Sequence, residues 1–222
     1  MNNISKEDYL SAIYKYRNKD GEIKANLIAD KLQVSKAAVS DMLKKLSNDG
    51  HIKYEPYKGI KLTGNGEEYA KKMVRRHRIW EVFLHQIVGL KWDEVHDEAH
   101  KLEHSTSDKL LNKMEEMLDF PEFDPHGDPI PAKDGSLPKQ KKIVPLTILK
   151  EGQAGKVKRV NDFDNSFLQY ISNIGIKLDK EIIIKDVLDF DRSMLVIVEG
   201  KEINISSTIA SNIFVELKHS LN

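Results

Sequence analysis

Five of the eight histidines in this 222-residue chain fall between residues 77 and 104. Within that range His96, His100 and His104 follow one another at intervals of four residues, and Glu103 stands beside the last of them. Four residues are slightly more than one helical turn, so these side chains share one face of a predicted helix. Imidazole nitrogens and carboxylate oxygens bind divalent transition metals, and the pattern therefore predicts a metal site.

The same four-residue step occurs a little earlier, at His77, Glu81 and His85. Two facing helices with such stripes can hold divalent ions without any sulfur ligand. The chain has no cysteine, which excludes disulfides, thiolate zinc sites and cysteine nucleophiles. A metal-dependent hydrolase is one alternative, but the sequence lacks the HExxH motif and any nucleophile arrangement. A metal-independent interaction module is another. We expect a protein that is not an enzyme.

The composition is that of a globular protein, with 40% hydrophobic and 32% charged residues. No apolar run approaches the roughly 20 residues that span a bilayer, and the first nine residues lack an apolar signal-peptide core. We therefore expect a cytoplasmic protein with no membrane partner. Residues 1–76 carry 16 Lys and Arg against 10 Asp and Glu, whereas residues 77–140 carry 7 against 14. A basic first third favours a polyanion partner, and an acidic middle favours cations.

Residues 5–50 have the pattern of three helices. Apolar residues at helical spacing predict a first helix after the N-cap Ser5, a second over 23–32, and a third from 35 to about 48. Ser35 is the predicted N-cap of the third helix. Because only a short turn joins the second and third helices, this segment is predicted to be a helix-turn-helix.

Residues 51–62 alternate apolar and polar side chains around a turn at 56–59, which predicts a hairpin. A helix-turn-helix followed by a basic hairpin is a winged helix, which places its third helix in the major groove of double-stranded DNA. A winged helix used for protein contacts is the alternative. Asp41 is unusual on the DNA-facing side, because a carboxylate there must accept from a cytosine amino group or point aside. The predicted groove-facing residues are Ser35, Lys36, Ala37 and Ser40, with Lys44, Tyr57 and Lys58 near phosphates.

The middle of the chain predicts long helices over 67–88, 92–106 and 109–118. Their many large apolar side chains need a partner surface, and we expect a homodimer formed through roughly residues 80–118. Four prolines between 120 and 135 predict a non-helical linker.

From Ile143 onward the pattern changes to short apolar segments separated by glycine and Asp or Asn turns. Short strands around a small helix predict a small β-barrel. The predicted elements are strands at 146–149, 155–160, 181–184, 194–198 and 202–205, a helix at 167–174, and a turn at 206–212.

Several motifs together resemble those of a known family: Tyr9-Leu10 with Ile13-Tyr14, the helix-turn-helix, Lys58-Gly59, Arg76-His77-Arg78, and the run from Val95 to His104. The chain resembles the DtxR/MntR family of metal-dependent bacterial transcriptional repressors over essentially its whole length. The resemblance implies a fold that is mainly α with a small all-β domain. It implies a winged helix-turn-helix DNA-binding domain at 1–66, a helical dimerisation and metal-binding domain at 67–140 with a Pro-rich linker at 120–140, and a FeoA-like, SH3-like β-barrel at 141–222.

The resemblance also implies two metal sites, an ancillary site and a primary, activating site. The ancillary site matches His77, Glu81 and His96, and the primary site matches Asp8, His100, Glu103 and His104. In some members a loop before the short helix of the barrel adds ancillary ligands. Asp162 and Asp164 occupy that loop here.

The expected metal is Mn²⁺, with Fe²⁺ as the alternative. Asp8 follows the manganese-responsive branch of the family, whereas the iron-responsive branch has methionine there. The hard oxygen of a carboxylate favours Mn²⁺. His100 departs from both branches, and Ser11 stands where some manganese regulators place a glutamate that helps form a binuclear site. Affinity rises from Mn²⁺ towards Cu²⁺ for any nitrogen and oxygen site, so Zn²⁺, Co²⁺ or Ni²⁺ are expected to substitute in vitro.

The expected function is that of a metal-sensing repressor of metal-uptake and homeostasis genes. It would bind a palindromic operator as a homodimer and take no small-molecule substrate. A metal joining Asp8 to the dimerisation domain would select the spacing of DNA-binding units that matches two half-sites. An Fe²⁺-responsive regulator of the same family is the alternative.

Overall fold

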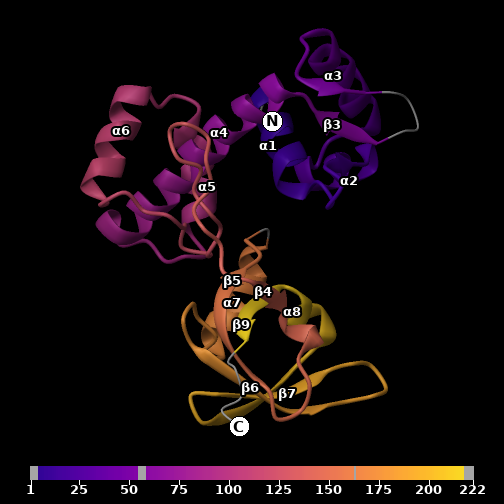
Figure 1. Ribbon diagram of the computed structural model, residues 1–222, viewed down its shortest axis with the longest axis vertical. Helices are drawn as coiled ribbons and strands as arrows, with labels where there is room; N and C mark the ends of the chain where they lie inside the picture. Colours follow the sequence, from indigo (N-terminus) through magenta and orange to yellow (C-terminus); the bar gives the residue numbers. More distant parts are fainter. Residues whose placement is uncertain (1–4, 55–58, 163, 218–222) are drawn as a thin grey trace. The chain divides into compact units, whose positions relative to one another are not determined.

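The computed structural model describes residues 5–54, 59–162 and 164–217, and the chain divides into two compact units (Figure 1). The first unit comprises the described residues up to His77 together with Pro131–Leu137. The second comprises Arg78–Ile130 and the described residues from Pro138 onward. The boundary falls inside the long helix α4, Gly64–Phe83, so that helix contributes to both units. Among the described residues, no helix is both long and apolar enough to cross a membrane.

The first unit packs three helices on a small antiparallel sheet whose strand order is β1-β3-β2. Its elements before α4 are α1 (Lys6–Tyr16), β1 (Glu22–Ile23), α2 (Ala25–Leu32), α3 (Lys36–Asn48), β2 (Ile52–Lys53) and β3 (Ile60–Leu62). The side chains that fill its core are apolar and fully buried, among them Leu10, Ile13, Ile28, Leu43 and Ile60.

The predicted helix-turn-helix is confirmed, and the local chemistry of its turn is clear. Gln33 adopts a left-handed conformation (φ 52°) and closes α2, and the Ser35 side chain accepts a hydrogen bond from the N–H of Ala38 to cap α3. The second helix was predicted to begin at residue 23 but begins at Ala25. The reason is tertiary, because the two residues of β1 pair with β3 instead of joining the helix.

The helical part of the second unit is formed by the end of α4, α5 (Val95–Glu103) and α6 (Asp108–Met117). The helix α4 passes into a π-helical turn at Leu84–Val88 and stops at Gly89, whose φ is +85°. The helix predicted over 67–88 does continue to Val88, but it begins at Gly64 and its last turn is π-helical. The helix predicted over 92–106 is shorter and spans Val95–Glu103. The facing sides of these helices bury Ile79, Val82, Leu111 and Met114.

The rest of the second unit is an antiparallel sheet of six strands in the order β4-β9-β5-β6-β7-β8, coloured orange to yellow in Figure 1. Its elements are β4 (Ile143–Pro145), the 3₁₀ helix η2 (Leu146–Ile148), β5 (Ala154–Val160), α7 (Asn165–Asn173), β6 (Glu181–Val187), β7 (Met194–Val198), β8 (Lys201–Ile205), α8 (Ser207–Ser211) and β9 (Ile213–Leu217). Two predictions were wrong here. The segment 146–149 is a 3₁₀ turn following Pro145, and 206–212 contains a helix that leads into the unpredicted strand β9.

Strand β5 lies inside this sheet and carries an irregularity. Val157 pairs with Val215 and Arg159 pairs with Phe214, so Lys158 is an extra residue and forms a β-bulge. Beyond its end the chain continues through Asp162 to α7.

Candidate metal centres and DNA-contact surface

Glu81 is the middle of the first candidate metal centre. It lies on α4, is fully buried, and its Oε1 stands 3.2 Å from Nδ1 of His96 on α5. Asp162, from the segment after β5, approaches the same His96 nitrogen at 3.9 Å. His77 lies one turn before Glu81 on α4 and is also buried. The predicted pairing of Glu81 with His96, and the placement of Asp162 beside them, thus appear in the geometry of the second unit.

His126 belongs to this centre as well, although it lies in the segment that the sequence predicted to be a Pro-rich linker. It is fully buried, and Glu81, His126 and Asp162 each offer a ligand atom within 4.8 Å of the others. Its Nε2 lies 2.7 Å from the carbonyl oxygen of Trp92, so Nε2 carries the proton in the neutral ring. The other nitrogen, Nδ1, is buried, has no hydrogen-bond partner among the described residues, and stands 4.0 Å from Glu81 Oε1. A lone pair held in this way fits a metal ion.

A tight turn at residues 124–128 presents His126 to the centre. Asp124 Oδ1 accepts hydrogen bonds from the N–H groups of His126 and Asp128. Arg78 of α4 lies within 3.5 Å of carboxylate oxygens of both aspartates. On its other side the turn is fastened to β5, because the Val160 N–H donates to the His126 carbonyl. We call Glu81, His96, His126 and Asp162 together the Glu81 centre.

The signal for His126 was present in the sequence as Asp124-Pro125-His126-Gly127-Asp128. An aspartate followed by proline and glycine predicts a turn of defined shape instead of a flexible linker. The sequence did not reveal that this turn packs between α4 and β5, since that depends on contacts between distant segments.

The electrostatics of the Glu81 centre favour an added cation. Burial raises the pKa of the Asp124 carboxyl to about 7, and the charges of Glu81 and Asp128 act in the same direction, against that of Arg78. Burial alone lowers the pKa of His126, but the neighbouring carboxylates raise it above its ordinary value. Both shifts have the charge of Glu81 among their causes, and for His126 the neighbouring carboxylates outweigh burial. A divalent cation offsets the charge of these carboxylates in exchange for protons.

We therefore expect Mn²⁺ binding to the Glu81 centre to release protons. Because the pKa of His126 is raised, a proton competes with the metal for its Nδ1, and affinity should fall as the pH is lowered. Calorimetric titrations in buffers of different ionisation enthalpy measure the number of protons released. Binding heats that are independent of the buffer would contradict this expectation.

A second candidate centre lies at the end of α5, where the stripe of the sequence continues. His100 Nδ1 is 3.0 Å and His104 Nε2 is 3.4 Å from the same oxygen of Glu103, which is buried. We call these three residues the α5 centre. His85, on the π-helical turn, is exposed and its Nδ1 lies 2.8 Å from the carbonyl oxygen of Leu90.

Two predicted ligands have other roles in the structure. Asp8 lies in the first unit, where its Oδ2 accepts hydrogen bonds from the Ser5 N–H (2.6 Å) and hydroxyl (2.9 Å) in a capping box. Asp164 is exposed and caps α7 by accepting from the N–H groups of Ser166 and Phe167. The assignment of each carboxylate as a metal ligand stays a prediction.

Among the predicted DNA-contact residues, Lys36, Ala37, Ser40 and Lys44 lie on α3 and Ser35 is its N-cap, and their contacts with DNA stay a prediction. Tyr57 and Lys58 lie outside the described residues. Ser40 is half-buried, while Ser35, Lys36, Ala37 and Lys44 are exposed on the first unit.

Models of three protein-domain families match consecutive parts of the chain. Residues 3–60 match the iron dependent repressor N-terminal DNA binding domain, and residues 63–132 match the iron dependent repressor metal binding and dimerisation domain. Residues 144–217 match the FeoA domain. The two repressor domains indicate DNA and a second copy of the chain as partners.

Named relatives and solved structures agree with these matches. The HTH-type transcriptional regulator MntR of Bacillus pumilus is 32% identical over 120 residues, which are 54% of this chain and 83% of that protein. The diphtheria toxin repressor of Corynebacterium efficiens is 27% identical over 97% of this chain and 96% of its own length. The structure of a manganese-dependent transcriptional repressor in complex with manganese superposes with a TM-score of 0.90 at 34% identity, covering 96% of this chain and 100% of that one. The chain therefore belongs to the DtxR/MntR family of metal-dependent, DNA-binding transcriptional repressors, which are not enzymes.

Proposed function

We propose that this protein is a manganese-responsive repressor in the cytoplasm. As a homodimer with Mn²⁺ bound, it binds a palindromic operator and represses genes of metal uptake and homeostasis. The observation that carries the proposal is the Glu81 centre, where the buried Glu81 and the half-buried Asp162 lie beside a histidine nitrogen that has no hydrogen-bond partner among the described residues. The similarity to a manganese-dependent repressor solved with manganese supports the choice of metal.

The composition of the candidate ligands favours Mn²⁺, with Fe²⁺ as the second candidate. Both centres offer only nitrogen and oxygen, and the carboxylates of Glu81, Glu103 and Asp162 are hard donors that suit Mn²⁺. The specific observation in favour of Fe²⁺ is the number of imidazoles, since each centre also contains two histidines.

The metal would act by holding segments that are distant in the sequence. In the Glu81 centre the ligands would be Glu81, His96, His126 and Asp162, with His77 added from the preceding turn of α4. In the α5 centre, we propose that Asp8 completes the ligand set from the DNA-binding domain and that Asp164 contributes to neither centre. A bound ion supplies positive charge and fixed coordination. An ion held by both Asp8 and the α5 centre would restrict the DNA-binding domains to spacings that suit an operator. To shift the ratio of DNA-binding to non-binding conformations from about 1:99 to about 99:1, the metal must bind the first conformation more tightly by about 5.5 kcal/mol.

The decisive experiment is a set of DNA-binding titrations with the full chain and an operator obtained by selection from random DNA. Metal is removed first, and Mn²⁺, Fe²⁺ and Zn²⁺ are then each buffered over the same free concentrations. We expect Mn²⁺ to raise operator affinity by at least about tenfold. An affinity that no metal changes would sink the proposal, and a response to Fe²⁺ at lower free concentration than to Mn²⁺ would favour an iron regulator.

Asp8→Asn should abolish the metal response while leaving the dimer and the metal-free DNA affinity intact. The amide oxygen of asparagine can still accept from the Ser5 N–H, so the variant keeps the cap but loses the charge that a metal requires. The matched control is Ser5→Ala, which removes the hydroxyl partner of Asp8 and retains the carboxylate. It should lower helix stability by about 1 kcal/mol and keep the metal response. Fluorescence anisotropy measures the operator affinity with and without metal, and sedimentation measures whether the dimer is intact. A retained metal response in Asp8→Asn would exclude Asp8 as a ligand.

Asp41 on α3 should determine one base of the operator. Its side chain is 80% exposed and lies 3.7 Å from Lys44 Nζ, a cation that offsets repulsion from phosphate. A carboxylate accepts from the cytosine amino group, whereas asparagine pairs with adenine. Selection from random DNA should therefore change one half-site position from C to A in Asp41→Asn, with about 1–3 kcal/mol lost on the original operator. Asp30→Asn, an exposed residue of α2, is the control. Identical selected sequences for Asp41→Asn and the unaltered chain would refute this role.

A further inference from the structure

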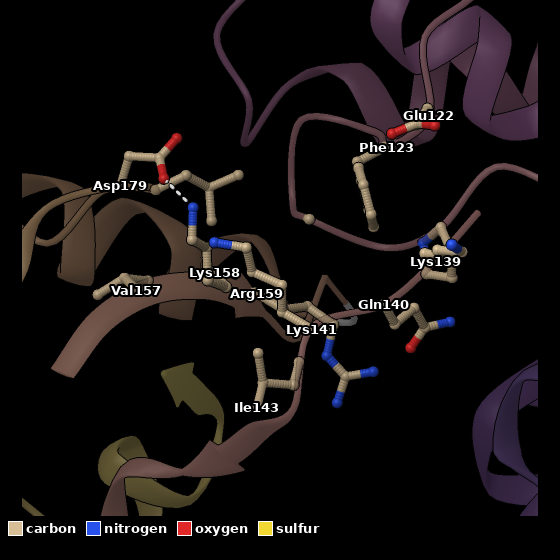
Figure 2. Close-up of a pocket in the computed structure, with 13 residues that line it drawn as sticks. Glu122, Phe123, Lys139, Gln140, Lys141, Ile143, Val157, Lys158, Arg159 and Asp179 are labelled. Carbon is tan, nitrogen blue, oxygen red and sulfur yellow. Dashed lines mark hydrogen bonds and ion pairs between the residues drawn. The ribbon is translucent and has the colours of Figure 1, made fainter. Parts of the chain in front are cut away.

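A cavity of about 320 Å³ lies in the second unit beside the bulge of β5 (Figure 2). Figure 2 shows Phe123 on one side of it and Ile143 and Val157 on the opposite side, with Lys158 paired to Asp179 at its edge. The walls are mainly apolar, and the volume lies in the range of pockets that hold small molecules.

The β-bulge explains why consecutive residues of one strand line this cavity. In a regular strand Lys158 and Arg159 would point to opposite faces of the sheet. The extra residue at Lys158 interrupts that alternation, and Val157, Lys158 and Arg159 all contribute to the lining. The Lys158 carbonyl packs so closely against Gly127 that a Cβ there would lie 2.0 Å from the oxygen. The bulge is therefore held in place by the neighbouring turn.

Arg159 is the group in the cavity wall that most clearly lacks a partner for part of its side chain. Its guanidinium stacks on the Phe214 ring at 3.9 Å from the centroid, which fixes the orientation of the plane. One Nη1 atom stands 3.4 Å from Asp128, but the buried Nε has no hydrogen-bond partner among the described residues. An unsatisfied buried donor is costly, and a carboxylate beside a fixed guanidinium accepts two parallel hydrogen bonds.

The charges around the cavity point to an anion. Lys158 shares Asp179 with Lys156, and Lys141 pairs with Glu216 at 2.9 Å. The lining has four cations, Lys139, Lys141, Lys158 and Arg159, against the two carboxylates of Glu122 and Asp179. Lys139 has no ion-pair partner among the described residues, so the lining keeps an excess of positive charge. An apolar interior with a positive rim complements a molecule that is apolar at one end and anionic at the other.

We propose that this cavity binds a small organic anion with an apolar body, whose charged end lies against Arg159 and Lys139. We assign the ligand as an effector and not a substrate, because the described lining residues include no serine, threonine, cysteine or histidine. The charged end of the ligand is either a carboxylate or a phosphate monoester, because the same residues can bind both groups. The proposal is independent of metal and DNA binding, so its failure would leave the proposed function standing.

The test uses the metal-free full chain with three probes of matched body: phenylacetate, phenyl phosphate and the uncharged phenylacetamide. Calorimetry gives their affinities, and amide chemical shifts at residues 157–159 locate the binding. We expect one of the two anions to bind at least about tenfold more tightly than the amide, a difference of about 1.4 kcal/mol. The anion that binds more tightly shows whether the charged end of the ligand is a carboxylate or a phosphate monoester.

The variants separate a built site from general attraction to a basic protein. Arg159→Gln should remove the preference for the anion, and Lys139→Gln, which changes only an exposed rim residue, should reduce it by about threefold. Lys201→Gln, an exposed residue of β8, should leave it unchanged. Equal binding of the amide, absence of saturable binding by both anions, or an unchanged preference in Lys139→Gln would each overturn the proposal, even if Arg159→Gln fails to fold.

Discussion

Replacing Glu81 with glutamine is expected to lower the affinity of the Glu81 centre for Mn²⁺ by at least about 100-fold, the upper end of what loss of an outer-shell partner costs. Glu81 is fully buried and its Oε1 lies between the Nδ1 atoms of His96 and His126, at 3.2 Å and 4.0 Å. Glutamine keeps the shape of the side chain but removes the charge that a divalent ion requires. The fall should therefore reflect lost coordination and not a collapsed core.

Equilibrium dialysis against buffered Mn²⁺ measures this loss, and Glu98→Gln is the matched control. Glu98 lies on α5 with its side chain 46% exposed and paired to Lys101. A second reading without metal comes from the titration of His126, because Glu81 raises the pKa of that ring. In Glu81→Gln the pKa of His126, followed by NMR, should move down. If Glu81→Gln kept the wild-type metal affinity and the pKa of His126 did not change, Glu81 would not be a ligand of this centre.

Gly127→Ala is expected to destabilise the second unit by about 2–5 kcal/mol and to weaken metal binding at the same time. Gly127 has φ +90°, and a Cβ would stand 2.0 Å from the Lys158 carbonyl oxygen. The left-handed conformation alone costs about 1–2 kcal/mol, and forcing backbone apart adds about 1–3 kcal/mol. The turn can relieve the clash only by moving away from β5, which would displace His126.

Gly135→Ala provides a matched control for this effect. Gly135 has a similar φ of +80°, but its Cβ would meet only Lys71 Cδ at 3.7 Å, an ordinary contact. It should therefore lose only the conformational part, about 1–2 kcal/mol, with unchanged metal affinity. Urea denaturation and dialysis compare the two variants. Equal losses would show that the close approach to Lys158 has no energetic importance.

The sequence was most informative where a pattern is local. Three correctly predicted features lie within one helix or between adjacent helices: the cap at Ser35, the short turn after α2, and the four-residue steps of the histidines and carboxylates. Helix geometry alone determines which of these side chains lie on one face. The pairing of Glu81 with His96 was expected on this basis together with the family resemblance. The strands β5, β6, β7 and β8 were likewise predicted from short apolar segments between glycine and Asp or Asn turns.

The failures occurred where distant segments decide the outcome. Residues 22–23 left the second helix because β3 was available to pair with them. His126 stood in a proline-rich segment that indicated a linker, and only its burial against α4 and β5 makes it a candidate ligand. Asp8 and Asp164 cap helices through short-range contacts, and a metal-binding role for either depends on segments that are distant in the sequence.

The Glu81 centre gathers side chains that are far apart in the sequence, from α4, α5, the turn at 124–128 and the segment after β5. Such a centre exists only while all four segments are folded together, so a bound ion opposes their separation. At a free concentration 100 times its dissociation constant, one ion adds about 2.7 kcal/mol to folding stability. Proteases cleave a folded protein at a rate that follows the population of its transiently unfolded form, provided that unfolding and refolding are fast relative to cleavage. The intracellular lifetime of the protein should therefore follow metal supply, and metal starvation would reduce the amount of the repressor as well as its activity.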